Sequence, residues 1–167
     1  MGKGIPLHHF LDSNTKLYII EFKACRTDIC YIMQGDQINP VLGDLVIVEA
    51  DRGRDLGKVA NILTANEICQ VKRLFRLADA LEITTLYTKK SDEEKALLVC
   101  QTKVQQRELP MQVVSAEYQW DRRKLTFYFL ADQRIDFREL VRELFKIYKT
   151  RIWMCALKSN TNELLPE

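Results

Sequence analysis

Basic side chains recur at a spacing that could hold the phosphates of a nucleic acid. Arg138, Arg142 and Lys146 are spaced four residues apart, so on a helix they would line one side. Arg and Lys donate charge-assisted hydrogen bonds to phosphate oxygens, and each such contact adds to a salt-dependent affinity. Helix faces are routinely charged, and Glu139 and Glu143 each precede a basic residue by three positions. A solvated face with weak surface ion pairs therefore fits the same row equally well.

The neighbourhood of this row is also basic. Residues 121–151 carry nine Lys or Arg against five Asp or Glu, a net charge of +4 in a chain whose total is +2. A local excess of positive charge attracts anionic partners. The side chains that we expect to bind a nucleic acid or an acidic partner are Arg52, Arg54, Arg122, Arg123, Lys124, Arg138, Arg142, Lys146, Lys149 and Arg151.

Aromatic residues lie beside these basic ones. The segment 124–129 has the basic and aromatic character of strands that stack RNA bases, but it lacks the glycines of the RNP1 signature. Phe127 and Phe129 are therefore expected in the core. Tyr118 and Trp120, next to a predicted turn, are the better candidates for stacking on bases.

Arg52 and Arg54 flank Gly53 in a stretch of alternating charge, Asp51–Asp55. Glycine supplies the positive φ that a tight turn requires, so a structural turn with internal ion pairs explains this pattern. The alternative is that both arginines contact an anion or a partner from a rigid hairpin.

The residues needed for catalysis or metal binding are sparse. His8 and His9 are the only histidines, and Cys25 and Cys30 have no second pair to complete a tetrahedral metal site. Asp132 and Asp136 could bind Mg²⁺ in a nuclease, but a helix cap already explains Asp136. We expect no catalytic residues, no metal and no cofactor.

Length and composition describe an ordinary globular chain. It has 167 residues, of which 47% are hydrophobic and 29% charged, which corresponds to about one domain. The longest apolar runs are far shorter than the ~18 residues that suggest a membrane span. Five scattered cysteines suit reduced thiols, and the N-terminus lacks the features of a secretory signal, so we expect a cytoplasmic protein.

The hydrophobic pattern predicts the elements that must position these side chains. We expect strands at 17–23, 29–33, 45–49, 57–62, 111–119, 124–131 and 151–155. Ser91 with Glu94 forms a capping-box pattern that predicts a helix over 91–107, and Asp136 with Glu139 predicts one over 136–149. The stretch 64–88 is compatible with either a helix or a strand.

These elements predict an α+β fold in which two main helices cover a mostly antiparallel sheet and a small β subregion lies at the N-terminus. We expect a single domain over 17–157, between flexible tails at 1–16 and 158–167.

Four segments carry a resemblance to a known family. They are Asp51–Val59, Lys124–Phe129, Ile135–Val141 and Lys149–Met154. In this order they resemble the C-terminal domain of the yeast polymerase suppressor protein family, which is named for suppression of DNA polymerase alpha mutations. The resemblance runs from about Leu17 to Cys155. Fungal members place similar segments at the C-terminal end of longer proteins, so this chain is compatible with an excised domain, and the sequence does not decide whether it is one.

The resemblance implies a role in post-transcriptional control. Kinetoplastid proteins with this domain bind cycling sequence elements in mRNA, and bacterial relatives belong to a complex that guides transcript maturation by an endoribonuclease. Those bacterial relatives also have clustered cysteines near the chain end and are linked to iron–sulfur clusters. Only Cys155 lies in that region here, so no cluster is expected.

The function that we predict is a non-catalytic regulatory module. It would bind nucleic acid, with mRNA as the expected class, or assemble an mRNA-handling complex. The alternative is a protein-interaction scaffold without nucleic-acid affinity, in which the same Arg and Lys side chains meet an acidic partner. The sequence assigns no oligomeric state.

Overall fold

The computed structural model describes residues 5–6, 15–23, 26–64 and 70–157. The expected C-terminal tail, most of the expected N-terminal tail, both histidines and Cys25 lie outside the described residues. The chain forms two compact units, residues 1–87 with 119–121 and residues 88–118 with 122–167. The expectation of a single domain over 17–157 stays a prediction.

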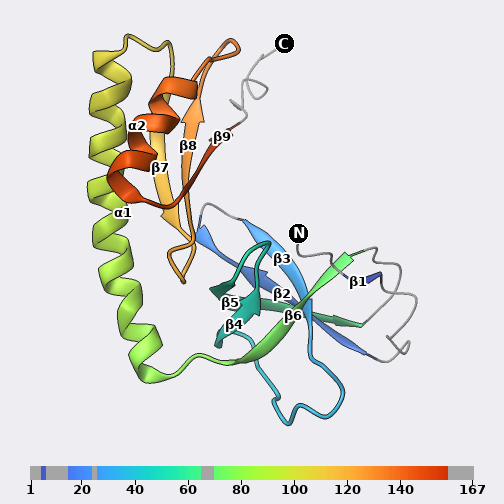
Figure 1. Cartoon of the computed structure of the whole chain (residues 1–167). Helices are drawn as coiled ribbons and strands as arrows, with labels where there is room; N and C mark the ends of the chain where they lie inside the picture. Colours follow the sequence, from blue (N-terminus) through green and yellow to red (C-terminus); the bar gives the residue numbers. More distant parts are fainter. Residues whose placement is uncertain (1–4, 7–14, 24–25, 65–69, 158–167) are drawn as a thin grey trace, which may run out of the picture. The chain divides into compact units, whose positions relative to one another are not determined.

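The first unit contains a sheet that closes on itself (Figure 1). Its strands are β1 (Ile5–Pro6), β2 (Lys16–Glu21), β3 (Thr27–Tyr31), β4 (Leu45–Glu49), β5 (Arg54–Thr64) and β6 (Gln70–Leu77). β2 pairs antiparallel with β3 and β5, and β4 pairs antiparallel with β5 and β6. A parallel pairing of β3 with β6 completes the ring, and β1 adds to β6. The small, mostly antiparallel N-terminal β region is thereby confirmed.

Alternating apolar residues fill the interior of this ring. Tyr18, Ile20, Val46, Val59 and Leu74 are all at most 2% exposed and pack in one cluster. Gly57 on β5 allows two strands to approach closely, because a Cβ there would lie 2.3 Å from Ile20 Cγ2 and 2.8 Å from a ring carbon of Phe22.

Helix α1 (Ala80–Gln106) begins in the first unit and belongs to the second unit from Thr88 onwards. The second unit also contains β7 (Gln112–Tyr118), β8 (Lys124–Leu130), α2 (Arg138–Tyr148) and β9 (Arg151–Ala156). The strand order is β7-β8-β9, with β7 antiparallel to β8 and β9 parallel to β8. The expected helix-strand-strand-helix-strand order is confirmed, as is the α+β class (Figure 1). β8 is the central strand of the three, as the apolar residues on both of its faces predict.

One apolar core joins both helices to the same face of this sheet. Ala96 and Cys100 from α1 and Leu140 and Leu144 from α2 are fully buried against it, together with Phe127 of β8. A buried carboxylate also ties α1 to β7: Glu93 accepts hydrogen bonds from Lys89 Nζ at 2.9 Å and from the Tyr118 backbone N–H at 2.6 Å.

The start of α1 differs from the sequence prediction. The helix begins at Ala80 rather than at Ser91, which lies inside it. Asp79 and Glu82 form the capping box, since each side chain accepts the other's backbone N–H, at 2.8 and 2.9 Å. The undecided stretch 64–88 thus contains both β6 and the first turns of α1. No helix among the described residues has the length and apolar character needed to cross a membrane.

The start of α2 also differs. Phe137, not Asp136, is the N-cap residue, because its carbonyl accepts the first helical hydrogen bond from Val141 at 2.9 Å. The Asp136 carboxylate still accepts the Arg138 backbone N–H at 3.2 Å. The apolar spacing of residues 137, 140, 141, 144, 147 and 148 predicts one buried stripe on this helix. Ile147 departs from that prediction, because it is 49% exposed.

Gly57→Ala should destabilise the first unit, because the added methyl carbon would overlap Ile20 and Phe22. Overpacking of this kind costs about 1–3 kcal/mol of unfolding free energy. Urea denaturation should show that loss. Lys58→Ala, at the exposed neighbour on the same strand, should stay within about 0.5 kcal/mol of the unaltered chain. An unchanged midpoint for Gly57→Ala would contradict the close strand approach.

Asp79→Ala should lower the unfolding free energy by about 0.5–2 kcal/mol, because it removes the α1 cap. Ser91→Ala is the matched test of the alternative start. It should be neutral or slightly stabilising, since alanine is the better residue inside a helix. The two variants are compared by thermal and urea unfolding. A larger loss for Ser91→Ala would mean that the functional start of the helix is at 91.

Candidate nucleic-acid interface

Basic residues from two segments meet where β8 and β9 begin. The Thr150 hydroxyl donates to the Arg122 carbonyl at 2.8 Å, which joins the α2–β9 connection to the β7–β8 turn. Parallel pairing then places Lys124 beside Arg151. We call this group the strand-end cluster; its members are Arg122, Arg123, Lys124, Lys149 and Arg151.

The positive charge of the strand-end cluster is only partly balanced. Arg122 forms an ion pair with Asp92 at 3.0 Å and lies 4.6 Å from the centre of the Tyr118 ring. No carboxylate among the described residues pairs with Lys124, Lys149 or Arg151. Neighbouring strands are about 4.8 Å apart, and like charges on facing residues destabilise a sheet. An anion placed between Lys124 and Arg151 would remove that repulsion.

The backbone of the cluster contains two unfavourable conformations. Arg122 has φ of 64° and Lys149 has φ of 53°, both in the left-handed region that favours glycine. Such a conformation costs a non-glycine residue roughly 1–2 kcal/mol. Lys149 sits at the end of α2, and its N–H closes the helix by donating to the Phe145 carbonyl at 2.8 Å. Strained residues of this kind gather at functional positions.

The predicted basic row lies on the exposed side of α2. Arg138 is bound to Asp136 at 2.7 Å and Arg142 to Glu139 at 2.7 Å, so much of their charge is compensated locally. Hydrogen bonds from the Arg138 side chain and backbone lower the pKa of Asp136 to about 2. Within the described part of the chain, no carboxylate pairs with Lys146. The least compensated charge of α2 is therefore at its C-terminal end, next to the strand-end cluster.

The aromatic residues predicted to stack on bases are otherwise engaged. Tyr118 is only 8% exposed, and Trp120, in the first unit, donates its backbone N–H to Asp55 and its indole N–H to Thr85. Phe127 and Phe129 are buried, as expected.

Trp153 of β9 is the aromatic residue that the sequence analysis missed. It is 47% exposed, and the Arg151 guanidinium lies 5.0 Å from its ring centre. The signal available in the sequence was the alternation of the last strand, in which residue 153 shares a face with residue 151. Phe145 on α2 is likewise 50% exposed between basic residues.

Arg52 and Arg54 belong to the first unit. They flank Gly53, whose φ of 78° confirms the predicted turn between β4 and β5. The Arg54 guanidinium lies 4.5 Å from the centre of the Phe75 ring. The backbone N–H of Arg54 donates to the Asp121 carboxylate at 2.7 Å.

The acidic residues of that turn pair elsewhere. Asp55 binds Arg26 at 2.8 Å, and Asp51 lies 3.6 Å from Lys72 Nζ. The ion pairs expected within the turn are thus formed instead with β6 and with the residues before β3.

Two of the described cysteines, Cys30 and Cys100, are buried free thiols. Burial raises the pKa of both Cys30 and Cys100 to about 12. In the described segments, no three His, Cys, Asp or Glu side chains are grouped so that they could hold a metal ion.

A family model described as the PSP1 C-terminal conserved region matches residues 72–157, just over half of the chain. The chain belongs to this family. The matched segment contains α1, α2, β7, β8 and β9, and with them the strand-end cluster, the α2 row and Trp153. Arg52 and Arg54 lie outside it. The resemblance to the polymerase suppressor family is confirmed.

Individual relatives come from fungi and bacteria. An uncharacterised protein of Schizosaccharomyces pombe is 47% identical over 90% of this chain and 24% of its own length. Protein PSP1 of Saccharomyces cerevisiae is 39% identical over 53% of this chain and 14% of its own. Stage 0 sporulation protein YaaT of Bacillus subtilis is 38% identical over 64% of this chain and 40% of its own. The PSP1-type chain therefore spans less than half of each relative, and no solved structure matches it.

Lys149→Gly should stabilise this PSP1-family domain, because glycine adopts the left-handed conformation without the steric penalty of a side chain. The variant also loses a positive charge that is favourable at the C-terminus of a helix. The net increase in the free energy of unfolding should therefore be about 0.5–1 kcal/mol. Lys146→Gly, one turn earlier, should instead cost about 1 kcal/mol. Urea unfolding of both variants checks this contrast; a loss of stability in Lys149→Gly would contradict it.

Proposed function

We propose that the second unit is a non-catalytic module that binds single-stranded RNA through the strand-end cluster and the exposed side of α2. In the cell it would act in the cytoplasm, in post-transcriptional control of mRNA. The observation that carries this proposal is the adjacency of Lys124 and Arg151, which face each other on parallel strands without a carboxylate partner among the described residues.

The basic side chains of this surface suit a ligand whose negative charges are regularly spaced. Lys146 in the last turn of α2 and Lys149 at its C-cap lie between Arg142 and Arg151 along the chain. A phosphodiester backbone presents one negative charge per nucleotide and can contact several of these side chains at once. Such contacts position a nucleic acid without reading its sequence.

Exposed aromatic rings among the basic side chains favour an unpaired strand over a duplex. Bases of single-stranded RNA are free to stack on Trp, Phe and Arg planes, whereas those of a duplex are stacked on each other. Trp153 is held by Arg151 with about half of its surface open, and Phe145 is open to a similar degree. Both could provide such platforms.

A titration followed by fluorescence anisotropy tests the proposal with labelled single-stranded RNA, matched DNA and duplex RNA, at low and at physiological salt. Lys124→Gln/Arg151→Gln should weaken RNA binding and make the slope of log K against log salt shallower by about 1.4, since each phosphate contact contributes about 0.7. Trp153→Ala should weaken binding without changing that slope.

Lys58→Gln/Lys90→Gln is the matched control, because it removes the same charge from exposed positions on β5 and α1. It should leave the affinity and the salt slope nearly unchanged. Equal losses in both double variants would mean that only net charge matters. If the unaltered chain binds RNA at neither salt, the proposal fails, and the same surface becomes a candidate for an acidic protein partner.

A further inference from the structure

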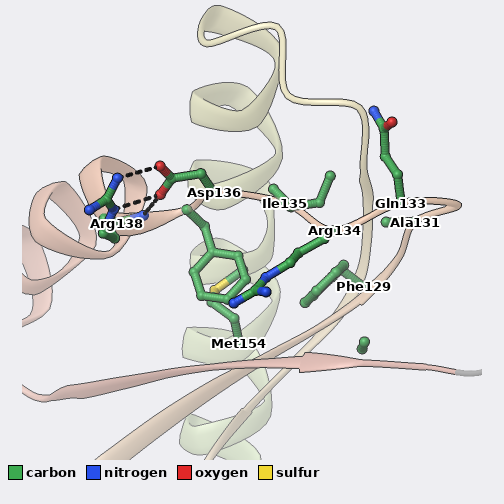
Figure 2. Close-up of a pocket in the computed structure, with 10 residues that line it drawn as sticks. Phe129, Ala131, Gln133, Arg134, Ile135, Asp136, Arg138 and Met154 are labelled. Atoms are coloured by element: carbon green, nitrogen blue, oxygen red, sulfur yellow. Dashed lines mark hydrogen bonds and ion pairs between the residues drawn. The ribbon is translucent and has the colours of Figure 1, made fainter.

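A cleft of about 820 Å³ opens in the second unit where β8 and β9 end (Figure 2). It is separate from the strand-end cluster, which lies where the same two strands begin. Its lining residues come from the end of β8, the connection to α2, the first residue of α2 and the end of β9. The volume is within the range of ordinary small-molecule sites.

The floor of the cleft is apolar and partly aromatic. Phe129 and Phe137 meet edge to face, with ring centres 6.0 Å apart and planes at 67°, and Met154 and Ile135 complete the apolar surface. Apolar surfaces that combine aromatic and thioether groups suit a planar heterocycle.

The polar groups around the cleft suit an anion attached to that heterocycle. Arg134 is exposed, and its side chain extends over the cleft towards Met154 in Figure 2. No carboxylate among the described residues pairs with it. The one carboxylate in the lining, Asp136, is bound by Arg138 through both oxygens, at 2.9 and 2.7 Å, so its charge is compensated. Arg134 is thus the side chain available for a phosphate.

The position of the cleft links it to the basic surface. In open α/β sheets, ligands bind beyond the carboxyl ends of parallel strands. The cleft lies at the corresponding end of the one parallel pair in this three-stranded sheet, β8 and β9. β8 has seven residues, which at about 3.3 Å each spans roughly 20 Å between the strand-end cluster and the cleft. Arg142 and Arg138 lie along α2 between the two ends, and Arg138 itself lines the cleft.

We propose that this cleft receives one unstacked base of the bound RNA strand, with the base on the partly exposed floor of Phe137, Ile135 and Met154, which Phe129 supports from below, and the adjoining phosphate on Arg134. This inference rests on the proposed function, because it assigns a place to one nucleotide of the same strand. It adds a site that reads a base, whereas the strand-end cluster contacts only phosphates.

A scan with abasic RNA tests the inference. A short labelled RNA is prepared with one base removed at each position in turn, and the affinity of the unaltered chain for each is measured by anisotropy. One position should be sensitive, with a loss of about tenfold or more, because stacking of one base is worth about 1–3 kcal/mol. Other positions that contribute only phosphates should change little.

Ala156→Phe is the variant that assigns the sensitive position to the cleft. Ala156 lines the cleft and is exposed, so an added ring occupies the cleft without needing room in the core. This variant should bind intact RNA about tenfold more weakly, and the abasic position should no longer matter. The matched control is Ala60→Phe, at an exposed alanine on β5 in the first unit, which should leave the scan unchanged.

A second measurement reports on the cleft without a bound strand. In a chain labelled with ¹³C at methionine methyls, AMP should shift the Met154 signal, adenosine should shift it at higher concentration, and inorganic phosphate alone should not. Arg134→Gln should reduce the advantage of AMP over adenosine. Equal shifts with phosphate alone would overturn the assignment of the floor to a base.

The outcomes separate this inference from the proposed function. If RNA binds but no abasic position is sensitive, or if the sensitivity persists in Ala156→Phe, the cleft is not a base site and the phosphate surface stands. If RNA does not bind but AMP still shifts Met154, the cleft binds a free nucleotide and the RNA proposal fails. If neither binds, both are wrong.

Discussion

The parallel pairing of β8 with β9 is the constraint on which the second unit depends. Because α2 connects the two strands, their starts lie together at one end and their carboxyl ends at the other. Burial of Leu140 and Leu144 against the sheet holds α2 in that crossover. Lys124 must then lie beside Arg151, and the connection that begins at Ala131 must return over the strand ends to reach Phe137. The strand-end cluster and the cleft are thus two consequences of one topology.

In most of the molecule, the local contacts of each helix and strand are the ones that its place in the topology requires. Apolar side chains of α1, α2 and the three strands form one continuous core, and the buried Glu93 has both a cation and a backbone donor. In the first unit, the absent side chain of Gly57 lets β5 and the strand that carries Ile20 approach. These features specify the scaffold, and none of them requires a ligand.

Most strands and the order of elements could be predicted from the sequence, because alternation of apolar residues is a local signal. The closure of the first sheet could not, since β6 pairs with β3 and β4, whose residues are far from it in the chain. The start of α1 was missed because Ser91 and Glu94 mimic a capping box, whereas the real one begins with Asp79. Ion pairs of Asp51 and Asp55 with Lys72 and Arg26 are non-local as well.

The basic side chains of the site were predictable from composition, but their relative importance was not. How far the charge of Arg138 is available to a ligand depends on its ion pair with Asp136. The exposure of Trp153 depends on β9 being an edge strand. Three local rules are broken at the same end of the unit: two basic residues adopt left-handed conformations, two like charges face each other, and a tryptophan stays half exposed. Glu108, in the connection from α1 to β7, is the third described non-glycine residue with a positive φ, but no other rule is broken beside it. Several violations at one place mark positions that function requires. Their coincidence is therefore a stronger argument for a binding surface than the net charge of the segment.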